Sequence, residues 1–180
     1  MSEEKQPNYF EFYELPIQFN PDQNAIKTKF YALSKKFHPD FYANESEAKQ
    51  EEVLNFSTLN NKAYQTLSNA NKCLKYVLEL KGIVATDEGY QLPQSFLMEM
   101  MEVNEALMDL EFEPDAEKLV QVKNDVDVIE KHLETELKTL LQKFDQNPDA
   151  SEVLFPSIKD LFYRQKYIAR IRERLPRVLS

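Results

Sequence analysis

The sequence predicts an all-helical protein with two parts, an N-terminal helical domain and a C-terminal three-helix bundle. Three observations lead to this fold class. Only two glycines occur in 180 residues, which leaves little material for tight β-turns or phosphate-binding loops. Apolar residues make up 42% of the chain and recur at the three- and four-residue spacing of amphipathic helices. Prolines and polar clusters divide these periodic stretches into separate helices.

The N-terminal domain is expected over residues 1–81. We expect its helices at residues 8–16, 22–37, 47–67 and 72–80. Pro16 should end the first helix, and Pro21-Asp22 should start the second. The third helix repeats apolar residues at threes and fours, so it should pack against the second as an antiparallel hairpin.

A linker and a bundle are expected to follow. Residues 82–92 hold both glycines and are the predicted linker. Residues 93–180 contain three long periodic segments with short connections, which predicts an antiparallel three-helix bundle. We expect its helices at residues 93–110, 114–146 and 151–175. Pro93 should lie in the first turn of the first of these helices.

Charge and composition exclude several classes of function. The net charge is −9 and the pI is about 4.9, so long-range electrostatics oppose nucleic acid and anionic membranes as partners. The single cysteine, Cys73, rules out an intramolecular disulfide. No segment approaches the roughly 18 apolar residues of a membrane span, and the N-terminus lacks a basic-then-apolar signal. We therefore expect a cytoplasmic protein.

Catalytic and metal-binding interpretations have little support. The two histidines, His38 and His132, are far apart, and His132 has no partner at the spacing of a helical metal site. One cysteine cannot supply a zinc or iron–sulfur ligand set. Glycine-rich nucleotide loops and the Gly-x-Ser-x-Gly motif are absent from the sequence. We expect no metal, no cofactor and no enzymatic activity. A helical enzyme that uses carboxylates remains an alternative.

The tetrapeptide Phe37-His38-Pro39-Asp40 stands where the second helix should end. Proline disfavours helical geometry at His38 and has no amide hydrogen, and Asp40 favours a turn. The preceding helix has a basic face of four lysines: Lys27, Lys29, Lys35 and Lys36. Lys35 should point directly away from the apolar stripe, with the other three beside it. A basic helix that ends in a polar turn suits docking on an acidic surface.

The helix expected at 93–110 has more apolar residues than one stripe can use. One side carries Phe96, Met100, Val103, Leu107 and Leu110. A second row, Leu97, Met101 and Met108, lies about 80–100° around the helix. Beside this row are Met98, Glu102, Glu105 and Asp109.

Two interpretations of the second row are open. Between Gly82 and Glu117 there are ten acidic residues and no basic one, so an exposed row would be a methionine-rich partner-binding surface with an acidic rim. Alternatively, the row widens a core-facing stripe, and the acidic residues form the solvated back of the helix.

The His-Pro-Asp turn, together with the basic helix before it and the apolar helix after it, resembles the J domain of DnaJ-type co-chaperones. The resemblance narrows to the HscB family, whose J proteins serve iron–sulfur cluster delivery. It is carried by residues 8–16, 37–40, 60–67, 76–82 and above all 96–102 (Phe-Leu-Met-Glu-Met-Met-Glu), and it covers nearly the whole chain. The glycine/phenylalanine-rich linker and cysteine-rich zinc domain of a general DnaJ are absent from the sequence.

The resemblance implies two docking surfaces. The J domain would bind an HscA/DnaK-type ATPase chaperone through His38, Pro39 and Asp40, with Lys29 and Lys35 as positive contacts and Lys27 and Lys36 as further candidates. The bundle would bind an IscU-type scaffold protein through Leu97, Met98, Met101, Glu102, Glu105 and Asp109. The family's aromatic contact on the last helix best matches Tyr167.

The expected function is therefore that of a non-enzymatic adaptor. It would bind the scaffold, deliver it to the chaperone and stimulate the chaperone's ATPase. The alternative within the same fold is a generic J-domain co-chaperone whose bundle holds a different client.

Overall fold

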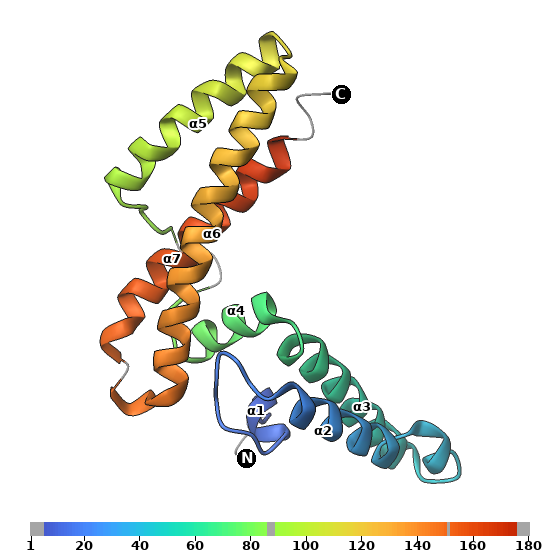
Figure 1. Cartoon of the computed structure of the whole chain (residues 1–180). Helices are drawn as coiled ribbons and strands as arrows, with labels where there is room; N and C mark the ends of the chain where they lie inside the picture. The colour runs from blue at the N-terminus through green and yellow to red at the C-terminus, as the bar shows by residue number, and fades with distance from the viewer. Residues whose placement is uncertain (1–5, 86–88, 151, 176–180) are drawn as a thin grey trace. The chain divides into compact units, whose positions relative to one another are not determined.

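The computed structural model describes residues 6–85, 89–150 and 152–175. Every regular element within these residues is a helix, which confirms the predicted all-helical class. The chain divides into two compact units, Met1–Val84 and Ala85–Ser180, and each is described by itself (Figure 1). The expected boundaries of the linker, between residues 81 and 82 and between residues 92 and 93, stay a prediction.

The first unit is built on a helical hairpin. Its described elements are α1 (Tyr9–Phe12), α2 (Gln23–Lys36), the 3-10 helix η1 (Pro39–Tyr42), α3 (Glu47–Leu67) and α4 (Ala70–Leu80). Helices α2 and α3 pack antiparallel, as expected, and η1 lies in their connection (Figure 1). Helix α4 begins two residues earlier than expected because the Asn69 side chain caps it, accepting a hydrogen bond from the Lys72 amide at 3.0 Å.

Helix α1 ends at Phe12, so the expectation that Pro16 ends it is wrong. Glu14 adopts a left-handed backbone conformation with φ of 53°. In this conformation the Leu15 amide donates to the Phe10 carbonyl at 2.9 Å, and the Glu14 amide donates to the Glu11 carbonyl at 3.0 Å. These two bonds satisfy carbonyls at the end of the helix, so a C-terminal cap ends it before the proline is reached.

A buried asparagine ties three elements of the first unit together. Asn60 on α3 is 1% exposed. Its side-chain oxygen accepts a hydrogen bond from the Tyr13 hydroxyl at 2.9 Å, and its amide group donates to the Phe30 carbonyl and the Ser34 hydroxyl of α2, each at 3.0 Å. Burial raises the pKa of the Tyr13 phenol, so this group stays protonated and donates. The network fixes α2 against α3.

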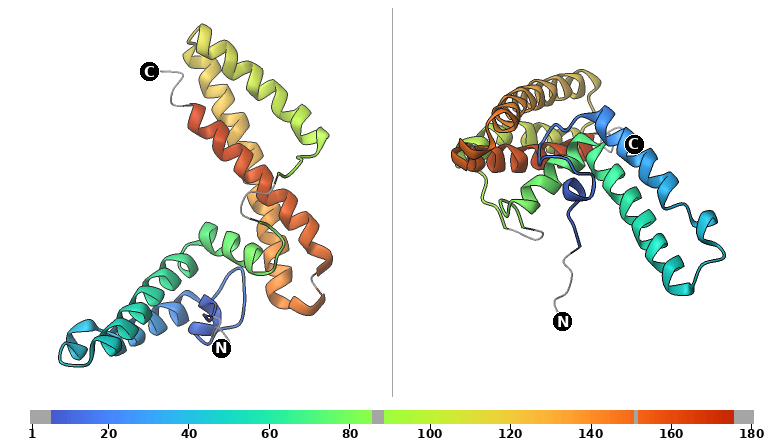
Figure 2. Two further views of the ribbon diagram at one scale, coloured as in Figure 1. Left: turned by 180° about the vertical axis from the view of Figure 1, so that it is seen from behind. Right: turned by 90° about the horizontal axis from the view of Figure 1, so that it is seen from below.

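The second unit is the predicted antiparallel three-helix bundle. Its described elements are α5 (Gln94–Phe112), α6 (Ala116–Gln146), the 3-10 helices η2 (Pro148–Ala150) and η3 (Glu152–Leu154), and α7 (Phe155–Arg174). Helix α6 packs against both neighbours, and α6 and α7 run side by side (Figure 2). Two expectations need correction. Pro93 is the residue before the first turn of α5, and α7 begins only at Phe155, because η3 precedes it.

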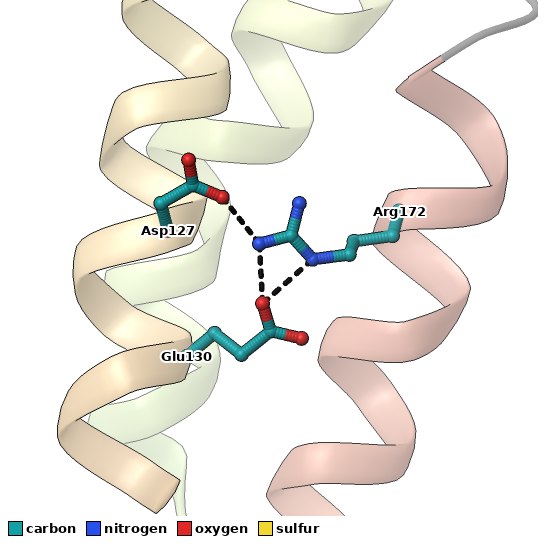
Figure 3. Close-up of polar contacts among 3 residues, drawn as sticks. All are labelled: Asp127, Glu130 and Arg172. Atoms are coloured by element: carbon teal, nitrogen blue, oxygen red, sulfur yellow. Dashed lines mark hydrogen bonds and ion pairs between the residues drawn. The ribbon is translucent and has the colours of Figure 1, made fainter.

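Each bundle helix buries one apolar stripe and exposes the rest of its circumference. Helix α5 buries five residues, Phe96, Met100, Val103, Leu107 and Leu110. Arg172 on α7 adds a polar tie to α6: its guanidinium pairs with Asp127 and Glu130, and its Nε donates to Glu130 Oε2 at 2.7 Å (Figure 3). Charge-assisted bonds of this kind fix the register of α7 along α6.

Candidate functional site

The His-Pro-Asp sequence forms an exposed, preorganised turn directly after α2. His38, Pro39 and Asp40 are all exposed. The His38 imidazole caps η1, with Nδ1 accepting a hydrogen bond from the Asp40 amide at 3.3 Å. Pro39 occupies the first position of η1, where an amide hydrogen would have no partner in the helix.

A second contact anchors this turn to the helix before it. The Tyr42 hydroxyl donates to the Lys36 carbonyl in the last turn of α2 at 2.9 Å. The carboxylate of Asp40 stands 3.7 Å from His38 Nδ1, and the Phe41 ring lies beside the imidazole with 5.6 Å between ring centroids. The turn therefore presents His38, Pro39 and Asp40 from a backbone held by short-range bonds.

The four lysines of α2 differ in how they are engaged. Lys29 pairs with Glu14, and this ion pair lowers the pKa of the Glu14 carboxyl. The Lys36 ammonium lies 5.1 Å from the centroid of the Phe37 ring. Lys27 and Lys35 are exposed, and no described carboxylate pairs with either of them. Lys27 and Lys35 are thus the two α2 cations that are most available to a partner.

The second apolar row of α5 is exposed, which decides between the two interpretations of that helix. In this row Leu97 is 42% exposed, Met101 59% and Met108 53%, and Met98 beside the row is 65% exposed. The core stripe of the same helix is at most 7% exposed. The interpretation of a widened core-facing stripe is therefore wrong, because within its unit α5 packs through one side only.

Acidic side chains lie along this exposed row. Glu102 and Glu105 are exposed, and no described cation pairs with either of them. Asp109 is also exposed, but it pairs with Lys118 near the start of α6 at 2.7 Å. The row with its acidic rim is a contiguous face on one helix, and we call it the α5 face (Leu97, Met98, Met101, Glu102, Glu105, Met108 and Asp109).

Tyr167, from α7, is half-buried and lies against α5. Its hydroxyl accepts a hydrogen bond from Asn104 Nδ2 at 2.8 Å, and its ring meets Phe96 edge-on at 5.7 Å between centroids. Asn104 in turn accepts a bond from Arg174 Nη1 at 3.0 Å. The structure thus places Tyr167 beside α5, and Asn104, which the sequence reasoning did not single out, holds it there.

The structure also exposes apolar side chains that the sequence reasoning missed. Phe112, at the end of α5, is 87% exposed. In the first unit Tyr31, Leu54 and Phe41 are 62%, 57% and 68% exposed. The signal for Phe112 was present, because it follows Met108 by one helical turn.

Neither a metal site nor a membrane span emerges from the described part of the chain. His, Cys, Asp and Glu side chains do not gather there in groups of three that could hold an ion. None of the helices in these residues has the length and apolar character needed to cross a bilayer.

Comparison with known proteins gives concordant matches for the two units. A family model described as the DnaJ domain matches residues 9–76, and one described as the HSCB C-terminal oligomerisation domain matches residues 92–176. The co-chaperone protein HscB homolog of Vibrio cholerae serotype O1 (strain M66-2) is 34% identical over 173 residues, which is 95% of this chain and 96% of the relative. The co-chaperone protein HscB of Proteus mirabilis (strain HI4320) is 32% identical over 114 residues, 63% of this chain and 66% of the relative.

Two solved structures resemble the whole chain. The chaperone HscB from Vibrio cholerae has a TM-score of 0.65 at 32% identity and covers 96% of this chain and 97% of its own. The human co-chaperone protein HscB has a TM-score of 0.70 at 22% identity and covers 98% of this chain and 84% of its own, which supports the fold.

Proposed function

Because this chain belongs to the HscB family of co-chaperones and carries an N-terminal J domain, we propose that it is an adaptor for iron–sulfur cluster assembly. It binds an IscU-type scaffold through its bundle and presents that scaffold to an HscA/DnaK-type chaperone through its J domain. Docking of the J domain stimulates the chaperone's ATPase. The adaptor itself catalyses no reaction.

One observation carries the proposal: each unit exposes a surface that its own fold does not use. In the first unit these are the His-Pro-Asp turn and two lysines, Lys27 and Lys35, that pair with no described carboxylate. In the second unit it is the α5 face, where apolar side chains stay exposed beside Glu102 and Glu105, which pair with no described cation. Exposed apolar rows of this kind mark protein-binding surfaces.

The two surfaces have opposite charge and belong to different units, so each attracts a different partner. The basic helix α2 attracts an acidic chaperone surface, and the acidic rim of the α5 face attracts a basic region of the scaffold. Lys29 and Lys36 contribute to the positive field around the turn, although each also has a contact within the protein.

The J domain acts on the chaperone by differential binding. A ligand shifts a conformational equilibrium only by as much as it prefers one state over the other. The His38-Pro39-Asp40 turn would therefore contact the chaperone more strongly in the conformation that hydrolyses ATP. The chemistry of hydrolysis remains that of the chaperone.

Steady-state ATP hydrolysis by an HscA-type chaperone tests this function. The rate is measured for the chaperone alone, with this protein, and with this protein plus an IscU-type scaffold. We expect stimulation by the protein and a further increase when the scaffold is added. Stimulation that is indifferent to the scaffold would keep the J-domain role and assign the bundle to another client. Absence of stimulation would overturn the proposal.

The cytoplasmic location expected from the sequence also stays a proposal. Fractionation of the producing cells, with detection of the protein in the cytosolic and membrane fractions, would check it.

A further inference from the structure

Helix α7 carries six cationic side chains in its described residues, and two of them differ from the rest. Three arginines form ion pairs: Arg164 with Asp160 at 2.7 Å, Arg174 with Glu111 at 3.0 Å, and Arg172 with Asp127 and Glu130. Lys159 is also engaged, and its ammonium lies 5.9 Å from the centroid of the Tyr90 ring. Lys166 and Arg170 are exposed, and no described carboxylate pairs with either of them, although the Lys166 ammonium lies 5.6 Å from the centroid of the Phe162 ring and 5.5 Å from that of the Tyr163 ring.

That Lys166 and Arg170 have no acidic partner among the described residues is informative, because acids are plentiful in this protein. The chain has 31 acidic and 22 basic residues, and the α7 arginines that are paired use acids from α5, α6 and α7 itself. Lys166 and Arg170 are four residues apart, so they project from the same face of α7. Their two positive charges therefore lie close together on the surface of α7.

These two cations line a hollow with a rigid aromatic wall. The hollow has a volume of about 270 Å³, and Tyr90, Leu92, Tyr163 and Tyr167 complete its lining together with Gly89. The Tyr90 and Tyr163 rings stack with centroids 4.4 Å apart and planes at 8°. The Tyr90 hydroxyl donates to Asp160 at 2.9 Å, and burial with this bond raises the pKa of Tyr90 to about 12, so the wall stays neutral.

The hollow borders α5 through Tyr167. Tyr167 belongs to its lining and contacts α5 through Asn104 and Phe96. Asn104 lies about one helical turn from Met101 and from Met108 of the α5 face, on the same side of α5. A partner that covers this part of the α5 face and Tyr167 therefore comes within reach of Lys166 and Arg170. Such a partner meets carboxylates on its α5 side and, on its α7 side, two cations that pair with no described carboxylate.

We propose that Lys166 and Arg170 extend the scaffold-binding surface across α7 and bind an acidic segment of the IscU-type scaffold. This inference rests on the proposed function, since it assigns a further part of the same surface. Charges at the edge of an interface raise the association rate and reject partners with the wrong charge pattern. An acidic rim on α5 and a basic rim on α7 together select a scaffold with a basic region beside an acidic one.

A double charge reversal tests the proposal on the full-length protein. Lys166→Glu with Arg170→Glu is compared with the wild type for scaffold affinity and association rate, at low and at high salt. Both residues are exposed, so the variant should keep its melting temperature. We expect the Kd to rise about tenfold, mainly through a slower association rate, and the difference from the wild type to shrink at high salt.

A matched control separates the site from the net charge. Lys131→Glu with Lys138→Glu changes the net charge by the same amount. Both control lysines are exposed on α6, outside its buried stripe. We expect this control to change the Kd by less than about threefold. An equal loss in both double variants would assign the effect to net charge and overturn the inference.

The remaining outcomes separate this inference from the function on which it rests. Wild-type affinity in the Lys166/Arg170 variant, with weakened binding in a Met101→Ala/Glu105→Ala variant, would overturn the inference alone. Failure of the wild type to bind the scaffold would overturn both. A further experiment titrates inorganic phosphate and monitors its binding to the hollow through the NMR signals of the tyrosines. If phosphate binds and the scaffold affinity of the variant is unchanged, the two cations bind a free anion and the inference is overturned.

Discussion

The His-Pro-Asp turn of the first unit and the α5 face of the second expose their side chains by different structural means. The turn is held by bonds between near neighbours, such as His38 Nδ1 to the Asp40 amide and the Tyr42 hydroxyl to the Lys36 carbonyl. The α5 face projects from a helix whose opposite stripe is fully buried. The geometry of the turn therefore depends on the identity of a few residues, whereas that of the α5 face depends on helical spacing.

This difference has a consequence for mutational sensitivity. A single substitution in the turn removes both a contact group and part of what holds the backbone. On the α5 face a truncated side chain leaves the helix in place, because Met100 and its neighbours in the core stripe anchor it. We expect function to be lost sharply in the first region and gradually in the second.

The largest effect is expected from His38→Gln. Glutamine cannot reproduce the ring that caps η1, so we expect stimulation of the chaperone ATPase to fall about thirtyfold or more, the size of a hot-spot loss. The measurement is the rate of ATP hydrolysis by the chaperone at a saturating concentration of the variant. Scaffold affinity and melting temperature should stay unchanged, because His38 is exposed and lies in the other unit. Full stimulation by the variant would refute the docking role of the turn.

The next effect is expected from Met101→Ala combined with Glu105→Ala. Removing an apolar contact and a carboxylate from the α5 face should raise the scaffold Kd about tenfold to a hundredfold, measured by titration calorimetry. Met101 is 59% exposed, so the melting temperature should barely change.

Met100→Ala is the matched control for this variant, since Met100 is adjacent in sequence but 0% exposed. Its truncation in the core should cost about 2–5 kcal/mol of unfolding free energy. Equal losses of stability in the Met100 and Met101 variants would show that the α5 face belongs to the core after all.

A smaller effect is expected from Asn60→Ala, which removes a buried hydrogen-bonding side chain from the first unit. The Phe30 carbonyl and the Ser34 hydroxyl would lose their donor, and the Tyr13 hydroxyl would keep only the Asn60 backbone carbonyl, so the free energy of unfolding should fall by about 1–3 kcal/mol in urea titrations. The neighbouring Asn61 is exposed, and Asn61→Ala should be close to neutral. Similar losses in the two variants would mean that the buried network contributes nothing specific.

The smallest effect is expected from single lysine substitutions on α2. Lys35→Ala should weaken chaperone binding about threefold to fivefold without changing stability, because Lys35 makes no ion pair with the described residues. Lys29→Ala should weaken binding less. Binding measured by fluorescence anisotropy would show the order, and a larger loss for Lys29 than for Lys35 would contradict it.

The two lysines should also differ in the pH dependence of stability. Lys29 lowers the pKa of Glu14, so their pair stabilises the fold above the ordinary glutamate pKa, and this contribution is lost as the pH falls through the lowered value. Lys29→Ala removes this pair, so its stability should fall slightly less than that of the wild type when the pH is lowered. The stability of Lys35→Ala should follow the same pH dependence as that of the wild type. Thermal unfolding between pH 3 and 7 would check this, at pH values that bracket the ordinary glutamate pKa of about 4.3.

Much of the fold was predictable because local patterns decide it. The spacing of Ile26, Phe30 and Leu33 and the Asp22 start signal predicted α2 to within a residue at each end. The same periodicity predicted the bundle and its order of helices. Short-range capping was harder to foresee: the left-handed Glu14 that ends α1 and the 3-10 helices η1 and η3 leave no comparable period in the sequence.

The sequence by itself determined the helices, the exposed His-Pro-Asp turn and the angular separation of two apolar rows on α5, because each depends on residues within a few positions of one another. Only the tertiary structure decided which of those rows is buried, because helical spacing gives directions but not the number of neighbouring helices. It also decided which charges pair within the described residues: Glu14 pairs with Lys29, whereas Lys35, Lys166 and Arg170 have no acidic partner there and are exposed. Those pairings join residues far apart in the chain, and only folding brings them within bonding distance.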